Sequence, residues 1–145
     1  MTLSKSHATW TGDLKSGKGT MSIGKKETPA PYGFGSRFEG TDGYTPEELL
    51  GAAHAGCFSM ALANKLASSG AKVNSIKTVA EVKLEKGAAG FSITGIQLNC
   101  EADVDGVDAA AFSKAAEEIK SGCPVSKALA SVPMQLSAKL LSKKG

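Results

Sequence analysis

Cysteine is scarce in this chain: there are three in 145 residues, and no two of them lie in a Cys-x-x-Cys spacing. An odd number without that spacing argues against a structural disulfide framework and indicates a reducing compartment. Clusters of like charge are also missing. The net charge is +3, and no basic group stands out apart from Lys143 and Lys144, so we expect neither nucleic-acid nor membrane binding.

Long hydrophobic runs are absent as well. Residues 1–20 contain none, which argues against a signal peptide. The longest apolar stretch, residues 49–63, is interrupted by His54 and Ser59 and is too short to span a bilayer. With 41% hydrophobic and 21% charged residues, the composition is that of one ordinary globular domain over residues 1–145. These absences predict a soluble, cytoplasmic protein.

The first 44 residues predict β-structure followed by a loop. Residues 8–11 and 19–23 are two short runs typical of strands. Residues 24–44 are rich in glycine and proline, which favours a long loop with one short extended piece at residues 34–38. A long ordered loop in a compact domain is usually functional.

A long helix is predicted to begin at Pro46. Thr45 is a good N-cap, proline suits the first helical position, and Glu48 completes a Thr-x-x-Glu capping box. Apolar residues continue to about Leu66, and Gly70 is the expected stop. Because apolar residues cover nearly every side, this helix must be buried all round. A second helix or a second subunit must therefore pack against it.

The second half of the chain predicts a β-hairpin, a helix and a closing strand. Residues 76–86 and 91–104 alternate apolar and polar side chains, as strands covered on one face do. A shorter helix follows the N-cap Asp108 and ends at Gly122, and residues 134–140 alternate again. This order of elements predicts the α+β class, with helices on one face of antiparallel sheet.

Two cysteines have contrasting local settings. Cys57 lies in the middle of the long apolar helix, where desolvation raises the pKa of a thiol. Cys123 opens a Cys-Pro-Val-Ser turn, where free backbone N–H groups favour a thiolate. If the fold brings the two together, one can attack a substrate and the other can resolve the product. The plainer interpretation of Cys57 is a small core residue, and Cys100 is assigned to the core face of its strand.

Arg37 and Glu47 are the charged residues that could activate Cys57. A guanidinium stabilises a thiolate, and a carboxylate could hold it in a bidentate pair, although Arg37 taken alone is more typical of an exposed loop arginine. Glu47 and Cys57 are separated by ten residues, which on a straight helix means about 15 Å along the axis and directions that differ by about 80°. Glu47 therefore cannot easily serve the Cys57 of its own chain. If both belong to one site, we expect Glu47 to come from a partner subunit.

Four segments of the sequence are distinctive. They are Pro31-Tyr32-Gly33-Phe34, Arg37-Phe38-Glu39-Gly40, residues 46–61 with His54-Ala55-Gly56-Cys57-Phe58, and Gly122-Cys123-Pro124-Val125-Ser126. Together they closely resemble the osmotically inducible protein C (OsmC) family, within the wider group that includes the organic hydroperoxide resistance (Ohr) proteins. The resemblance extends over nearly the whole chain.

The resemblance implies a thiol-dependent peroxidase of stress defence that reduces organic hydroperoxides in preference to hydrogen peroxide and needs no cofactor. By that similarity, Cys57 is the peroxidatic cysteine that forms a sulfenic acid, and Cys123 is the resolving cysteine that closes a Cys57–Cys123 disulfide. Arg37 and Glu47 are the activating pair. The family's fold is an intertwined homodimer with antiparallel sheets on a long buried central helix and two sites at the subunit interface. A dithiol such as dihydrolipoamide, free or on a lipoylated protein, is the reductant.

The substrate pocket is expected to be apolar, which suits alkyl or lipid hydroperoxides. The candidate lining residues are Phe34, Phe38, Phe58 and Met60. For each of the four taken alone, core packing is the plainer interpretation.

Two rival hypotheses remain open at this point. His54 and Cys57 have the i, i+3 spacing of a chelating pair, but the only other soft ligands are His7 and the remaining cysteines, with no close pair among them. The second rival is a dimeric binding module that holds an apolar small molecule between buried helices. That hypothesis predicts that Cys57→Ser would leave function intact.

Overall fold

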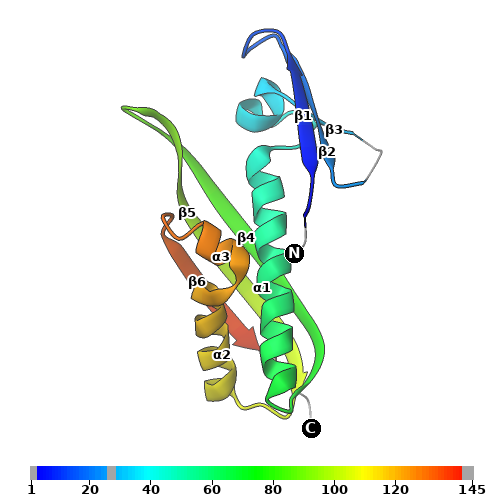
Figure 1. The fold of residues 1–145 in the computed structure, drawn as a ribbon. Coiled ribbons are helices and arrows are strands. Elements are labelled where there is room, and N and C mark those ends of the chain that lie inside the picture. The colour runs from blue at the N-terminus through cyan, green and yellow to red at the C-terminus, as the bar shows by residue number, and fades with distance from the viewer. Residues whose placement is uncertain (1–2, 26–28, 142–145) are drawn as a thin grey trace. The chain divides into compact units, whose positions relative to one another are not determined.

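The computed structural model describes residues 3–25 and 29–141, and Figure 1 shows the order of its elements along the chain. The chain divides into two compact units, residues 1–49 and 50–145. The boundary falls in the first turn of helix α1 (Pro46–Ser68), so this helix begins in the first unit and continues in the second.

The first unit contains a three-stranded antiparallel sheet. Its strands, in spatial order, are β1 (Ser6–Thr11), β2 (Lys18–Ile23) and β3 (Ala30–Tyr32). The two N-terminal strands expected from the sequence are confirmed, whereas β3 lies in a segment expected to be loop. The rings of Trp10 and Tyr32 approach each other to 5.5 Å between centroids. Both rings lie against Gly19, where an added Cβ would come within 2.4 Å of Tyr32, so this close approach requires glycine.

Residues 34–38 are helical, and the expectation of an extended piece there was wrong. Residues Gly35–Glu39 form a short π-helix, η1, which ends at Gly40 in the left-handed conformation (φ 69°). Ser36 closes this turn, because its Oγ accepts a hydrogen bond from the Gly33 N–H (3.0 Å) and donates one to the carbonyl of Tyr44 (2.9 Å). A side chain that bonds the backbone on both sides favours a compact turn over a strand.

The long helix α1 begins as the sequence predicts. The Glu48 N–H donates to Thr45 Oγ1 (2.9 Å), and the Thr45 N–H donates to the Glu48 carboxylate (3.2 Å), so the capping box is confirmed. At the other end, Gly70 has φ +94°, and the Ala71 N–H reaches back to the Leu66 carbonyl at 3.1 Å. This left-handed ending is the stop expected at Gly70.

The second unit contains a mixed three-stranded sheet, not a wholly antiparallel one. Strands β4 (Lys72–Gly87) and β5 (Gly90–Asp105) form the expected antiparallel hairpin. Strand β6 (Met134–Leu140) has the predicted bounds, but it pairs with β5 in parallel. The expectation of antiparallel pairing was wrong because the chain crosses back along the sheet through two helices before β6 begins, and such a crossover gives parallel neighbours.

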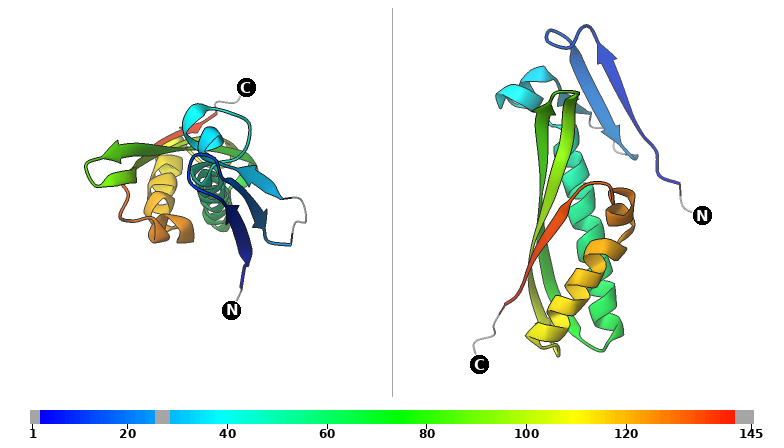
Figure 2. Two further views of the ribbon diagram at one scale, coloured as in Figure 1. Left: turned by 90° about the horizontal axis from the view of Figure 1, so that it is seen from above. Right: turned by 90° about the vertical axis from the view of Figure 1, so that its left-hand side faces the viewer.

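The crossover consists of α2 (Ala109–Gly122) and α3 (Pro124–Ala128). Asp108 caps α2 as predicted, since its carboxylate accepts from the Ala111 N–H at 2.7 Å. Within this unit the helices lie on one face of the sheet (Figure 2). Between helices and sheet lies one hydrophobic core, which includes Phe58, Leu98 and Phe112, each at most 1% exposed.

Helix α1 is not buried all round in the single chain. Phe58, Leu62 and Leu66 are at most 2% exposed, whereas Met60 is 77% exposed. Met60 belongs to a row of residues that are exposed along α1 at helical spacing and are apolar except at Asn64. We call its apolar members the α1 stripe: Ala53, Gly56, Met60 and Ala67. The expected covering of every side of α1 is therefore incomplete within one chain.

Candidate active site

Cys57 and Cys123 are neighbours in the second unit. Cys57 lies on α1, and Cys123 connects α2 to α3. Burial raises the pKa of the Cys57 thiol, while a hydrogen bond from the Val125 backbone N–H lowers it. The pKa of Cys57 is raised further by its hydrogen bond to Cys123 and by the charge of the Cys123 sulfur. Both thiols are free, and Cys57 packs against the hydrophobic core that contains Cys123, so the fold brings two reduced cysteines together.

Cys123 is held by the first turn of α3. It is the N-cap of that helix, and its sulfur accepts a hydrogen bond from the Ser126 N–H at 3.3 Å. Its thiol also donates to Ser126 Oγ at 3.0 Å. Pro124 occupies the first position of α3, where a missing N–H costs nothing. Ser126 therefore contacts the Cys123 sulfur through both its backbone and its side chain.

Ser126 also links Cys123 to a histidine that sequence reasoning did not assign to the site. His54 Nε2 lies 2.7 Å from Ser126 Oγ, across 72 positions of sequence. Both residues are buried, at 0% and 2% exposure. Burial lowers the pKa of His54, which keeps its imidazole neutral near pH 7. The one available signal was position, because His54 lies one helical turn before Cys57 and Ser126 lies three residues after Cys123.

Arg37 and Glu47 form an ion pair in the first unit. Arg37 Nε donates to both oxygens of the Glu47 carboxylate, at 3.1 and 3.2 Å, and Arg37 Nη2 also pairs with Oε1. The Glu47 side chain is 9% exposed and that of Arg37 is 35% exposed. The guanidinium therefore keeps one side accessible while the carboxylate fixes the other.

The four candidate pocket residues lie in different surroundings. Phe34 and Phe38 are half-buried in the first unit, with ring centroids 5.0 Å apart, and the Arg37 guanidinium lies 5.4 Å from the Phe38 ring. In the second unit, Phe58 is part of the hydrophobic core, whereas Met60 is exposed.

Cys100 is a core residue, as expected. It is 2% exposed on the core face of β5, and burial raises the pKa of its thiol. The confirmed core position gives this third cysteine no access to solvent.

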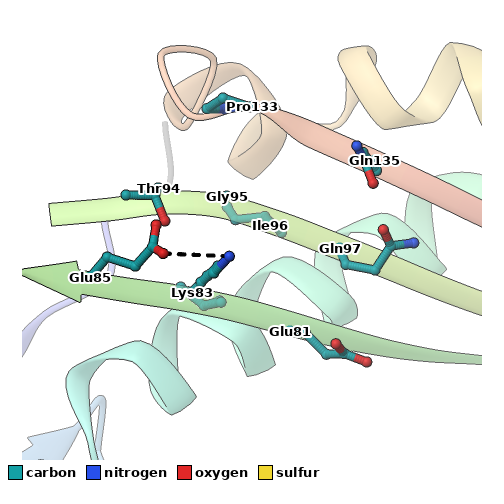
Figure 3. A pocket seen from close by; sticks show the side chains of 10 residues that line it. Glu81, Lys83, Glu85, Thr94, Gly95, Ile96, Gln97, Pro133 and Gln135 are labelled. Carbon is teal, nitrogen blue, oxygen red and sulfur yellow. Dashed lines mark ion pairs between the residues drawn. The ribbon is translucent and has the colours of Figure 1, made fainter.

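A cavity of about 510 Å³ opens on the second unit away from the cysteines. Figure 3 shows that its lining side chains come from β4, β5 and the start of β6, with Lys83 and Glu85 turned toward each other. Their Nζ and Oε1 atoms are 3.5 Å apart, and the side chains are 69% and 49% exposed, so this ion pair contributes little to stability. The cavity is open, its lining mixes charged, polar and apolar side chains, and it does not include Cys57, Cys123 or Ser126.

Within residues 3–25 and 29–141, no three or more His, Cys, Asp or Glu side chains gather closely enough to hold a metal ion. Among the same residues, no helix has both the length and the apolar character needed to cross a membrane.

Comparison with known proteins points to one family. A family model described as OsmC-like protein matches residues 39–137. The chain is 51% identical over 126 residues to a protein named Peroxiredoxin OsmC from Escherichia coli (strain K12), covering 86% of this chain and 88% of that protein.

Solved structures agree with this at the level of the fold. The OsmC-like protein of Mycoplasma pneumoniae superposes with a TM-score of 0.75 at 13% identity, covering 97% of this chain and 99% of the other. The organic hydroperoxide resistance protein OhrB of Bacillus subtilis gives a TM-score of 0.71 at 21% identity, covering 94% and 98%.

Proposed function

Because this chain belongs to the OsmC-like protein family, we propose that it is a peroxiredoxin-type enzyme that reduces organic hydroperoxides with its own thiols. The observation that carries the proposal is the contact between Cys57 and Cys123, two free thiols on separate elements of one unit. A buried core cysteine needs no second thiol beside it, whereas a peroxidatic cysteine needs a resolving partner within bonding reach.

The first step is attack by the Cys57 thiolate on the distal oxygen of the hydroperoxide. The sulfur gains that oxygen and becomes a sulfenic acid, the O–O bond breaks, and the alkoxide leaves and takes a proton to become the alcohol. Sulfur is oxidised by two electrons and the peroxide is reduced by two. Cys57 is partly exposed, so a small peroxide can reach it.

The second step is resolution by Cys123. Its sulfur displaces hydroxide from the Cys57 sulfenic acid, which leaves a Cys57–Cys123 disulfide and protects Cys57 from further oxidation. A dithiol such as dihydrolipoamide, free or protein-bound, then reduces the disulfide and is itself oxidised. A cycle that must return to two thiols suits a reducing, cytoplasmic environment.

Arg37 and Glu47 act in this proposal as the activating pair. Burial disfavours the Cys57 thiolate, so an adjacent cation is needed to offset that cost. Arg37 is suited to this role, because Glu47 holds one side of its guanidinium and leaves the other free to donate hydrogen bonds. The same donors would stabilise the negative charge that develops on the leaving oxygen.

The proposed active unit is a homodimer. The exposed α1 stripe is apolar and lies on the helix that carries Cys57, as a surface covered by a second subunit would. Since Glu47 and Cys57 cannot easily meet on one straight helix, we infer that Arg37 and Glu47 of one subunit serve Cys57 of the other. Phe34, Phe38, Phe58 and Met60 then remain candidates for an apolar substrate pocket, which favours alkyl or lipid hydroperoxides over hydrogen peroxide.

The experiment that tests this function is disulfide mapping after a single oxidation. The reduced protein is treated with one equivalent of an organic hydroperoxide, free thiols are blocked, and peptides are analysed by mass spectrometry. We expect a Cys57–Cys123 disulfide with Cys100 reduced, and one alcohol released per disulfide. Three unreacted cysteines would support the binding-module hypothesis instead, and a disulfide to Cys100 would show that the resolving residue is wrong.

A further inference from the structure

Three side chains in the second unit form a hydrogen-bonded chain that begins at Cys123 and ends at His54. Cys57 interacts with Cys123 at the start of this chain, and the Cys123 thiol donates to Ser126 Oγ at 3.0 Å. Ser126 Oγ lies 2.7 Å from His54 Nε2. Cys123, Ser126 and His54 are each at most 2% exposed, so this chain is shielded from bulk water.

Packing alone does not account for His54. Its side chain is fully buried on α1, yet its Nδ1 has no hydrogen-bond partner among the described residues. A buried polar atom without a partner costs stability, and an apolar side chain of similar size would avoid that cost. The histidine keeps one strong contact, to Ser126, and that contact leads directly to the resolving thiol.

We propose that Ser126 and His54 form a proton relay that deprotonates Cys123 when it attacks the Cys57 sulfenic acid. This inference rests on the peroxidase function proposed above. The Cys123 proton passes to Ser126 Oγ while the Ser126 hydroxyl proton passes to His54 Nε2. Cys123 becomes a thiolate, Ser126 stays neutral, and His54 becomes an imidazolium.

The relay balances the resolving step. The new S–S bond forms as the S–O bond of the sulfenic acid breaks, and the departing hydroxide takes up one proton to become water. The hydroxide consumes one proton, and the proton that His54 took from Cys123 is released to replace it. The net products are therefore the disulfide and one water molecule. Cys57 sulfur is reduced and Cys123 sulfur is oxidised, and no further oxidant is required.

The environment suits His54 as the acceptor. Burial lowers the pKa of His54, so its imidazole is neutral and ready to take a proton at the start of the step. The positive charge it then acquires lies near the Cys123 thiolate and is stabilised by it. Ser126 also lines a hollow of about 290 Å³ beside Lys120 and Met134, so the relay borders this hollow.

The test separates the two chemical steps in single turnover. Reduced protein is mixed with tert-butyl hydroperoxide, Cys57 sulfenic acid is trapped with dimedone, and the disulfide is quantified after acid quench, in H₂O and in D₂O. Ser126→Ala removes the shuttle. His54→Gln keeps a hydrogen bond to Ser126 but cannot take a proton, so a merely structural role would leave it near wild type. Ser59→Ala is the matched control, because it removes a half-buried hydroxyl of α1 that bonds to Thr78 Oγ1 (2.7 Å) and not to a residue of the relay.

We expect both variants to form the sulfenic acid at the wild-type rate and to close the disulfide roughly 10- to 100-fold more slowly, with a diminished solvent isotope effect. Ser59→Ala should match wild type in both steps. Should Ser126→Ala fail to fold, His54→Gln alone decides the outcome. Unchanged disulfide rates, or equal slowing of the peroxide step, would overturn the relay while leaving the peroxidase intact. Wild-type protein that forms no Cys57–Cys123 disulfide would overturn the function itself.

Discussion

Both carboxylate oxygens of Glu47 accept a hydrogen bond from Arg37 Nε, at 3.1 and 3.2 Å, so the guanidinium is fixed to the first turn of α1. Arg37 lies in η1, a segment whose fold depends on side-chain hydrogen bonds of its own. Glu47 is also favourably placed, since a negative charge near a helix N-terminus complements the helix dipole. The Glu47 carboxylate is nearly buried, whereas the Arg37 guanidinium is not. The pair therefore holds the guanidinium in a fixed orientation with part of its surface accessible.

The first prediction concerns this pair. Glu47→Gln keeps the size of the side chain but removes the charge that orients Arg37, so we expect oxidation of Cys57 to slow by on the order of 10-fold. The measurement is the second-order rate constant for sulfenic acid formation with an organic hydroperoxide. Glu118→Gln is the control, because it breaks an exposed ion pair with Lys65 instead. Equal rates in the three proteins would remove the pair from the mechanism.

The second prediction concerns the α1 stripe. Met60 is 77% exposed in the single chain, and Met60→Glu would place a charge in the centre of the proposed dimer contact. We expect dimer dissociation to become at least about 10-fold more favourable, because burying an unpaired carboxylate costs more than burying a thioether gains. Sedimentation equilibrium measures the dissociation constant, with Met60→Leu as the apolar control. If both variants associate alike, the stripe is not the interface.

The third prediction concerns Cys100, which packs in the core and bonds to Thr78. Cys100→Ala should leave peroxide turnover unchanged but lower the free energy of unfolding by about 1–2 kcal/mol, because it leaves a small cavity under β5. Urea denaturation gives the stability, and coupled peroxide consumption gives the turnover. A loss of turnover in a well-folded variant would give Cys100 a chemical role that its burial argues against.

The fourth prediction concerns pH and His54. Its pKa is lowered by burial, so the unfolded chain binds a proton at a higher pH than the folded protein does. Stability should therefore fall as the pH drops below about 6.5, and continue to fall until the lowered folded pKa is reached. Urea denaturation across this window should show the slope in wild type and a weaker one in His54→Gln. The exposed His7 is common to both proteins, so it cancels in the difference. Parallel curves would mean that folding does not lower the pKa of His54.

Local features of this fold could be predicted from the sequence because their causes lie within a few residues. The Thr45–Glu48 capping box, the Asp108 cap and the left-handed Gly70 each depend on hydrogen bonds or backbone freedom inside one turn. The alternation of apolar and polar residues over 134–140 predicted strand β6 for a similar reason, because alternate side chains of a strand face the core. The local settings of the two cysteines and the charged pair made them candidates, and the resemblance implied a role for each.

Only the tertiary structure decided how these elements pair and which side chains come into contact. Alternation in β6 is the same for parallel and antiparallel pairing, and the direction follows from the crossover through α2 and α3. The contact between His54 and Ser126 spans 72 positions and exists because α1 and α3 pack in one core. The sequence by itself determined which residues could carry chemistry, since that depends on their side chains. Their partners were decided by the path of the chain, because hydrogen bonds and proton transfer depend on distances that short-range patterns do not encode.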